Sequence, residues 1–153
     1  MKKAAKVMDV IAIICIVLYM LLMGAIFAGG LVAVIDPAKY LEEVNKVVKV
    51  INEYLVENNV SYQVRAFTAE SLKQYGLYLI IWGAVLFVYL GVVLCIFLGA
   101  LRNIKFNSPN KGVHIASLIF GILSVGLFGV LGGAFGIAAA SRVENQNNQA
   151  VAQ

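Results

Sequence analysis

Charge is scarce in this sequence and is missing altogether from its longest apolar runs. Only 13% of the 153 residues are Asp, Glu, Lys or Arg, whereas 61% are hydrophobic. Ordinary water-soluble domains of this size do not have that composition, which is typical of membrane proteins. The runs at 10–35, 77–101 and 113–140 contain no Asp, Glu, Lys or Arg. Ion-coupled transporters, proton relays and voltage sensors carry such residues at mid-membrane, so their absence argues against these classes.

Cysteines and catalytic motifs are equally scarce. Cys15 and Cys95 both fall inside apolar runs, which leaves no disulfide framework between the runs. At similar predicted depth they could be neighbours, and we interpret them as small packing residues rather than a redox or metal pair. The sequence contains no P-loop, nucleophile elbow or metal-binding pattern. We therefore predict no catalytic residue, no metal and no cofactor, and a protein that is not an enzyme.

Two titratable residues stand at the inner ends of apolar runs. Asp9 follows Lys6 by one turn, and we expect it to pair with a nearby lysine or arginine: Lys6, Arg102 or Lys105. His114 is the single histidine. Because no partner is visible in the sequence, we expect an interfacial residue rather than a ligand.

Each of the three runs exceeds the roughly 20 residues that a helix needs to cross about 30 Å of hydrocarbon. We therefore predict an all-α integral membrane protein with three transmembrane helices, at 10–35, 77–101 and 113–140. The first run is too long for a signal-peptide core, so it is expected to remain as an uncleaved anchor. The third is long and rich in glycine, and a tight reversal near Gly132 and Gly133 is the alternative to one tilted helix.

Basic residues beside the runs predict the topology. The tail 1–9 and the loop 102–112 carry three lysines or arginines each, which places both in the cytoplasm. In the segment 36–76 acidic residues offset the basic ones, so this segment is expected outside the cell membrane. Three crossings then put the polar tail 141–153 outside as well. Anionic lipid headgroups account for the net charge of +4, and we predict the lipid bilayer, not nucleic acid, as a partner.

The segment 36–76 has a helix start signal followed by an amphipathic pattern. Asp36 is a good N-cap and Pro37 suits the first helical position. The apolar residues recur at spacings of three and four on one face: Leu41, Val44, Val48, Ile51 and Leu55. We predict an extracellular amphipathic helix whose apolar face contacts the protein's own helix ends, the outer leaflet or a partner. The pattern leaves these three alternatives open.

The remainder of that segment is a connection between helices. Asn58 and Asn59 mark the end of the predicted outer helix. Residues 60–65 alternate between apolar and polar, which we interpret as an extended connection rather than a strand, because a lone strand has no partner. Thr68 is a plausible cap for a helix that enters the second run from outside.

Small residues recur every four positions in the second and third runs. Lipid tails are as apolar as leucine, so membrane helices associate where small side chains let their backbones approach closely. We predict a helix-packing interface made by these residues: Gly83, Gly91, Gly99, Ala116, Gly121, Ser124, Gly129, Gly132, Gly133 and Gly136. The interface joins the three runs to one another or to a partner.

The stretch SPNKGVHIASLIFGILSVGLFGVLGGAFGIAAA, residues 108–140, combines a basic turn with a glycine-punctuated apolar run. It resembles the C-terminal hairpin region of small multi-pass membrane proteins of Gram-positive bacteria, grouped as domains of unknown function. The long segment 36–76 departs from that pattern. The resemblance implies a bacterial plasma membrane and no activity.

Two functions fit these observations. The first is a small integral membrane protein that acts by protein-protein contact, as an accessory or assembly subunit of a membrane complex or of a homo-oligomer. Its partners are other membrane subunits or further copies of the chain. The alternative is an oligomeric channel-like module, or one that binds lipid or peptide. A channel requires a continuous small or polar face that no neighbouring side chain fills.

Overall fold

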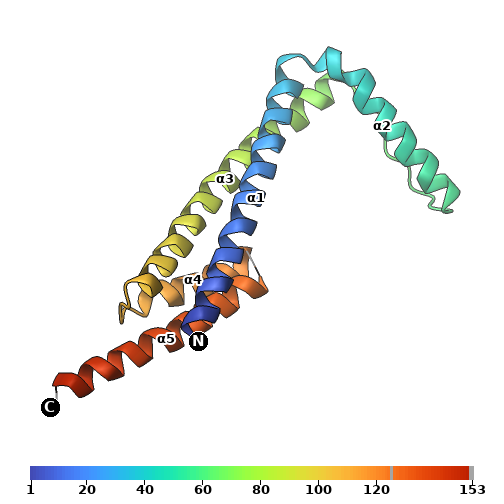
Figure 1. The fold of residues 1–153 in the computed structure, drawn as a ribbon. Helices are drawn as coiled ribbons and strands as arrows, with labels where there is room; N and C mark the ends of the chain where they lie inside the picture. Colours follow the sequence, from blue (N-terminus) through green and yellow to red (C-terminus); the bar gives the residue numbers. More distant parts are fainter. Residues whose placement is uncertain (125, 152–153) are drawn as a thin grey trace. The chain divides into compact units, whose positions relative to one another are not determined.

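The computed structural model describes residues 1–124 and 126–151. These residues form five helices and no strand (Figure 1): α1 (Lys2–Ile35), α2 (Pro37–Glu57), α3 (Ala69–Lys105), α4 (Gly112–Ser124) and α5 (Leu127–Val151). The helices α1, α3 and α5 are long and apolar enough to cross a membrane. The predicted all-α membrane class is therefore confirmed. Val125 of the third run and the last two residues of the polar tail lie outside the described residues.

The chain divides into two compact units, and α1 and α3 contribute a part to each. Unit 1 comprises Met1–Leu22 and Leu86–Gln153, and unit 2 comprises Met23–Val85.

Unit 1 contains a helix hairpin where one helix was predicted. The prediction of a continuous helix over 113–140 is wrong, because α4 ends at Ser124 and α5 begins at Leu127. Gly126, between them, has a φ of +60°, a conformation that glycine adopts without steric cost. The reversal therefore lies at Gly126. The alternative prediction placed it near Gly132 and Gly133, which lie later in the chain, within α5.

Contacts along the hairpin show that α4 and α5 are antiparallel. Three glycines of α5 lie directly against residues of α4 at matching intervals: Gly129 against Gly121, Gly133 against Leu118, and Gly136 against His114. The two helices lie side by side in Figure 1. Small residues at this contact let the backbones approach closely, as expected for helices in lipid.

The hairpin also changes the position of the polar tail. Lys111, just before α4, forms an ion pair of 2.5 Å with Glu144 in the second half of α5. Glu144 therefore lies beside the loop 102–112. The side of the membrane on which the tail 141–153 lies stays a prediction. A helix of 13 residues, such as α4, rises about 20 Å, which is less than the roughly 30 Å thickness of the hydrocarbon.

Side chains from α1 and α3 form the core of unit 1. Phe97 and Val93 of α3 are fully buried, as is Ile16 of α1. Ala5 and Ala12 of α1 are also fully buried. Alanine at these positions allows the α1 backbone to lie close to its neighbours.

In unit 2, the end of α1 runs antiparallel to the start of α3. A Cβ atom on Gly30 would lie 2.8 Å from the carbonyl oxygen of Gly76, and one on Gly76 would lie 2.9 Å from that of Gly30. The two backbones thus touch at this pair. Neither glycine was among the predicted interface residues.

The predicted helix signals of unit 2 are present. The side chain of Asp36 accepts a hydrogen bond from the amide of Lys39 at 3.3 Å. The helix α2 ends at Glu57, and Asn59 has a positive φ of 56°. Before α3, the Thr68 hydroxyl accepts a hydrogen bond from the Ser71 amide, and the Ser71 hydroxyl accepts one from the Thr68 amide. This reciprocal pair is a capping box.

Candidate functional site

The carboxylate of Asp9 and the imidazole of His114 are buried against the same face of α5. Asp9 of α1 is 0% exposed and His114 of α4 is 1% exposed. A Cβ atom on Gly132 would overlap Oδ1 of Asp9, and one on Gly136 would overlap the His114 ring. Because the two glycines are one helical turn apart, both side chains lie against the same stripe of α5. The glycines provide the space that these two side chains occupy.

The hydrogen bonds of these two groups differ from the sequence expectation. Neither carboxylate oxygen of Asp9 has a hydrogen-bond partner among the described residues, so the predicted pairing with Lys6, Arg102 or Lys105 is wrong. Asp9 points into the helix packing, where the lysines and arginines of the rim do not reach it. A buried polar atom without a partner costs free energy, and the structure places this cost at the contact between α1 and α5.

His114 has one partnered nitrogen and one without a partner. Its Nε2 lies 3.1 Å from the side-chain nitrogen Nδ2 of Asn103. The same nitrogen donates a hydrogen bond to the Asn110 carbonyl at 2.6 Å. Since that amide nitrogen is a donor, Nε2 is the acceptor and a neutral ring carries its proton on Nδ1. Within the described chain Nδ1 has no partner. His114 is thus a buried residue of the helix contact with Asn103 as its partner, and its position at the membrane interface stays a prediction.

Beside His114, a polar pocket of about 460 Å³ opens at the end of unit 1. The ends of four helices contribute to it: α1, α3, α4 and the second half of α5. Its lining residues are Met1, Lys2, Asn103, Ile104, Asn107, Ser108, His114, Ala139, Ala140, Arg142, Val143, Gln146 and Asn147. We call this the polar pocket. It contains two cationic side chains and no carboxylate among the lining residues of the described chain.

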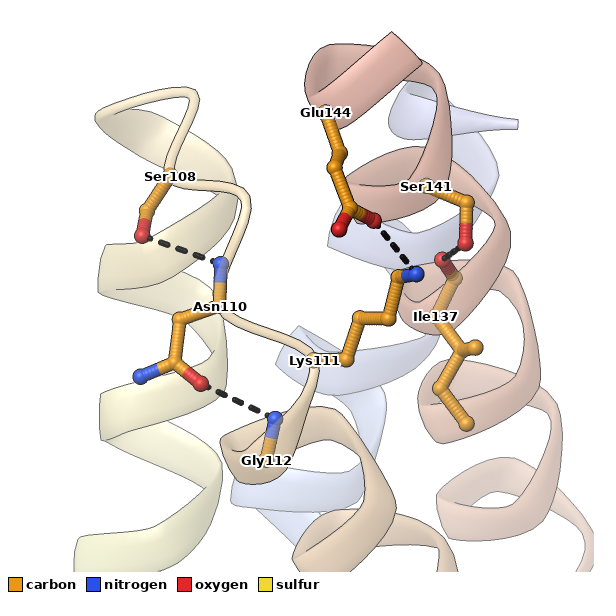
Figure 2. Close-up of polar contacts among 7 residues, drawn as sticks. All are labelled: Ser108, Asn110, Lys111, Gly112, Ile137, Ser141 and Glu144. Carbon is orange, nitrogen blue, oxygen red and sulfur yellow. Dashed lines mark hydrogen bonds and ion pairs between the residues drawn. The ribbon is translucent and has the colours of Figure 1, made fainter. Parts of the chain in front are cut away.

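The loop beside the polar pocket is held by local hydrogen bonds (Figure 2). Ser108 accepts a hydrogen bond from the Asn110 amide at 3.3 Å, and the side chain of Asn110 accepts one from the Gly112 amide at 2.9 Å. Figure 2 also shows the Lys111 side chain reaching Glu144 on α5. These contacts fix the connection between α3 and α4 against the second half of α5.

The remaining predicted interface residues have different environments. Gly83 packs on Phe27, where its Cβ would lie 3.3 Å from the Phe27 Cβ. Ser124 donates to the Phe120 carbonyl of its own helix at 2.5 Å. A Cβ on Gly91 would meet no described atom within 4 Å. The predicted stripe is therefore packed within the chain at some positions and open at others.

An apolar groove lies next to Gly91 on the surface of unit 1. It has a volume of about 350 Å³. It is lined by residues of α3 and α4: Val92, Cys95, Ile96, Gly99, Val113 and Ala116. Two predicted interface residues, Gly99 and Ala116, belong to it, and Cys95 is a free, exposed thiol. We call this the apolar groove.

In unit 2, the predicted stripe of α2 is partly covered by the connection that follows it. Val48 is buried; Leu41, Val44 and Leu55 are half-buried; and Ile51 is 42% exposed. On the polar face, side-chain hydrogen bonds raise the pKa of Lys46, with the larger effect from Glu42 and the smaller from Glu43. The extracellular position of α2 stays a prediction.

Two asparagines of α2 hold the extended connection 58–68, and sequence reasoning missed their role. The side-chain oxygen of Asn52 accepts a hydrogen bond from the backbone N–H of Val64 at 2.7 Å, and its side-chain nitrogen donates one to the Val64 carbonyl at 2.8 Å. Asn45 bonds Phe67 in the same way, at 2.7 and 3.0 Å. The seven-residue spacing that puts both on one helix face was the available signal.

The described residues contain no group of three or more His, Cys, Asp or Glu side chains placed to hold a metal ion. Comparison with protein-family models, curated proteins and solved structures finds no match to this chain.

Proposed function

We propose that this chain is a small integral membrane protein that acts by protein-protein contact, as an accessory or assembly subunit of a membrane complex or of a homo-oligomer. The observation that carries the proposal is the apolar groove together with Gly91. Gly91, Gly99 and Ala116 are half-buried there, and a Cβ atom on Gly91 would meet no described atom within 4 Å. In lipid, such surfaces are where another helix gains close contact.

The packing of the other small residues supports a contact protein over a channel. Gly121, Gly129 and Gly133 are filled by the hairpin itself, and the Gly132 and Gly136 positions are occupied by Asp9 and His114. A conducting path needs a continuous face that neighbouring side chains leave open. In unit 1 the polar groups of α1 and α4 are instead buried in the helix packing.

The topology proposed for this function follows from the hairpin. The tail 1–9, the loop 102–112 and the residues after 140 lie on the cytoplasmic side of the cell membrane, and the segment 36–76 lies outside. Basic residues of the first two segments support the assignment. The ion pair between Lys111 and Glu144 supports a cytoplasmic position for the residues after 140 as well.

Disulfide cross-linking through Cys95 tests the proposal. In the full chain carrying Cys15→Ser, mild oxidation in membranes is expected to link Cys95 to Cys95 of a second copy or to a cysteine of another subunit. Native mass measurement in mild detergent then distinguishes the homo-oligomer from the mixed complex. The reciprocal Cys95→Ser chain, which keeps the half-buried Cys15, is the matched control and should give no product.

Filling the groove should abolish the cross-link. Ala116→Leu and Gly91→Leu both add bulk where a partner helix would lie. Ile115→Leu, on an exposed neighbouring residue outside the groove, should leave the product unchanged. A strictly monomeric particle with no Cys95 product would contradict the proposal.

A further inference from the structure

The polar pocket has an electropositive lining whose charge the chain does not neutralise. Lys2 donates a hydrogen bond to the neutral side chain of Asn107. Neither Lys2 nor Arg142 takes part in an ion pair formed by described residues. The nearby carboxylate of Glu144 is engaged by Lys111. Two positive charges thus face the pocket without a protein counter-charge.

Neutral hydrogen-bonding groups complete the lining. Asn107, Ser108, Gln146 and Asn147 bring amides and a hydroxyl to the same space. Cations combined with neutral donors are the groups that bind phosphate oxygens in proteins. The volume of about 460 Å³ is sufficient for a phosphate group with a small substituent.

The position of the pocket in the sequence indicates where its ligand comes from. Lys2 precedes the charge-free run 10–35, and Arg142 follows the charge-free run 113–140. Residues at the ends of apolar runs lie at the level of lipid headgroups. Basic pockets between membrane helices on the cytoplasmic side are known to bind anionic headgroups.

We propose that the polar pocket binds a phosphate-bearing anion through Lys2 and Arg142, and that the headgroup of an anionic phospholipid supplies it. This site is separate from the apolar groove. A failure of either proposal therefore leaves the other standing.

Binding can be measured with the full chain in nanodiscs and in detergent. Phosphatidylglycerol is titrated into phosphatidylcholine nanodiscs, and bound lipid is counted by native mass spectrometry after gentle release. Lys2→Gln with Arg142→Gln is expected to weaken retention of phosphatidylglycerol about 30-fold, and each single change about fivefold. Lys105→Gln removes a charge from the same loop region outside the pocket and is the matched control.

A steric variant separates a built site from diffuse charge attraction. Ala139→Leu keeps all charges and fills part of the pocket, so it should also reduce lipid retention. This variant is informative even if the double charge variant fails to fold, which thermal unfolding would reveal. Equal retention by wild type, Ala139→Leu and the charge variants would overturn the proposal.

Inorganic phosphate distinguishes the two sources of the ligand. If a lipid headgroup is the ligand, phosphatidylglycerol raises the unfolding temperature of the wild type and inorganic phosphate does not. If phosphate alone gives the full rise, and the rise is lost in the Lys2 and Arg142 variants, the site holds but its ligand is soluble. If neither phosphatidylglycerol nor inorganic phosphate raises the unfolding temperature of the wild type, the proposed site is refuted.

Discussion

Gly121 of α4 and Gly129 of α5 touch backbone to backbone. A Cβ atom on Gly121 would lie 2.5 Å from the carbonyl carbon of Gly129. No side chain fits between them, because the neighbouring atoms belong to backbone and cannot rotate away. This pair sets how closely the two helices of the hairpin approach.

The first prediction concerns this contact. Gly121→Ala should lower the free energy of unfolding by about 1–3 kcal/mol, since the added methyl group forces the helices apart. Gly24→Ala is the matched control, because its Cβ would meet no described atom within 4 Å. It should be neutral or slightly stabilising, as alanine favours helix more than glycine does. Chemical unfolding in mixed micelles, followed by circular dichroism, measures both.

The second prediction concerns the turn of the hairpin. Gly126 has a φ of +60°, and a Cβ atom added to it would meet no described atom within 4 Å. Only the backbone conformation therefore opposes a side chain at this position. Gly126→Ala should cost about 1–2 kcal/mol of unfolding free energy. Gly126→Asn should cost less, because asparagine tolerates this conformation. Equal costs for the two variants would show that the turn does not depend on the left-handed conformation.

The third prediction concerns the buried carboxylate. Gly132→Ala should destabilise the protein because its methyl group overlaps Asp9. In the background of Asp9→Ala the same change should cost at least about 1 kcal/mol less, which is the coupling expected for residues in contact. Unfolding of the four proteins of this cycle gives the coupling directly. Additive effects would mean that the two residues do not meet.

The fourth prediction concerns the connection in unit 2. Asn45→Ala and Asn52→Ala each remove two hydrogen bonds to the backbone of residues 58–68, worth about 1 kcal/mol each. Hydrogen exchange at the amides of Val64 and Phe67 should accelerate, and proteases should cut the connection sooner. Lys49→Ala, which removes a solvent-exposed contact with Glu53 of 4.0 Å, should change neither rate.

Hydropathy and capping predicted the class and several helix bounds because they act locally. The run 10–35 lies within α1, and Asp36 with Pro37 starts α2 where expected. The hairpin was missed because hydropathy is continuous through residues 113–140. Gly126 is one glycine among several there, and only its backbone angle distinguishes it.

The polar features of unit 1 required tertiary information. Asp9 stands near basic residues in the sequence, so pairing was the natural expectation, yet its position on the helix turns it towards Gly132. The spacing of Gly132 and Gly136 indicated a packing stripe without indicating that polar side chains fill it. Gly30 and Gly76 were missed because neither has a small residue four positions before or after it, so neither belongs to a four-residue repeat.

The last prediction concerns topology and follows from the ion pair between Lys111 and Glu144. In a chain carrying Cys15→Ser and Cys95→Ser, single cysteines are placed at Glu53, Lys105 and Asn145. A membrane-impermeant maleimide applied to intact cells should label only the Glu53 position. The positions in the loop and in the second half of α5 should react only after the membrane is opened, because the hairpin returns the chain to the side from which it entered. Labelling of Asn145→Cys in intact cells, with Lys105→Cys protected, would contradict the proposed topology and restore the single crossing.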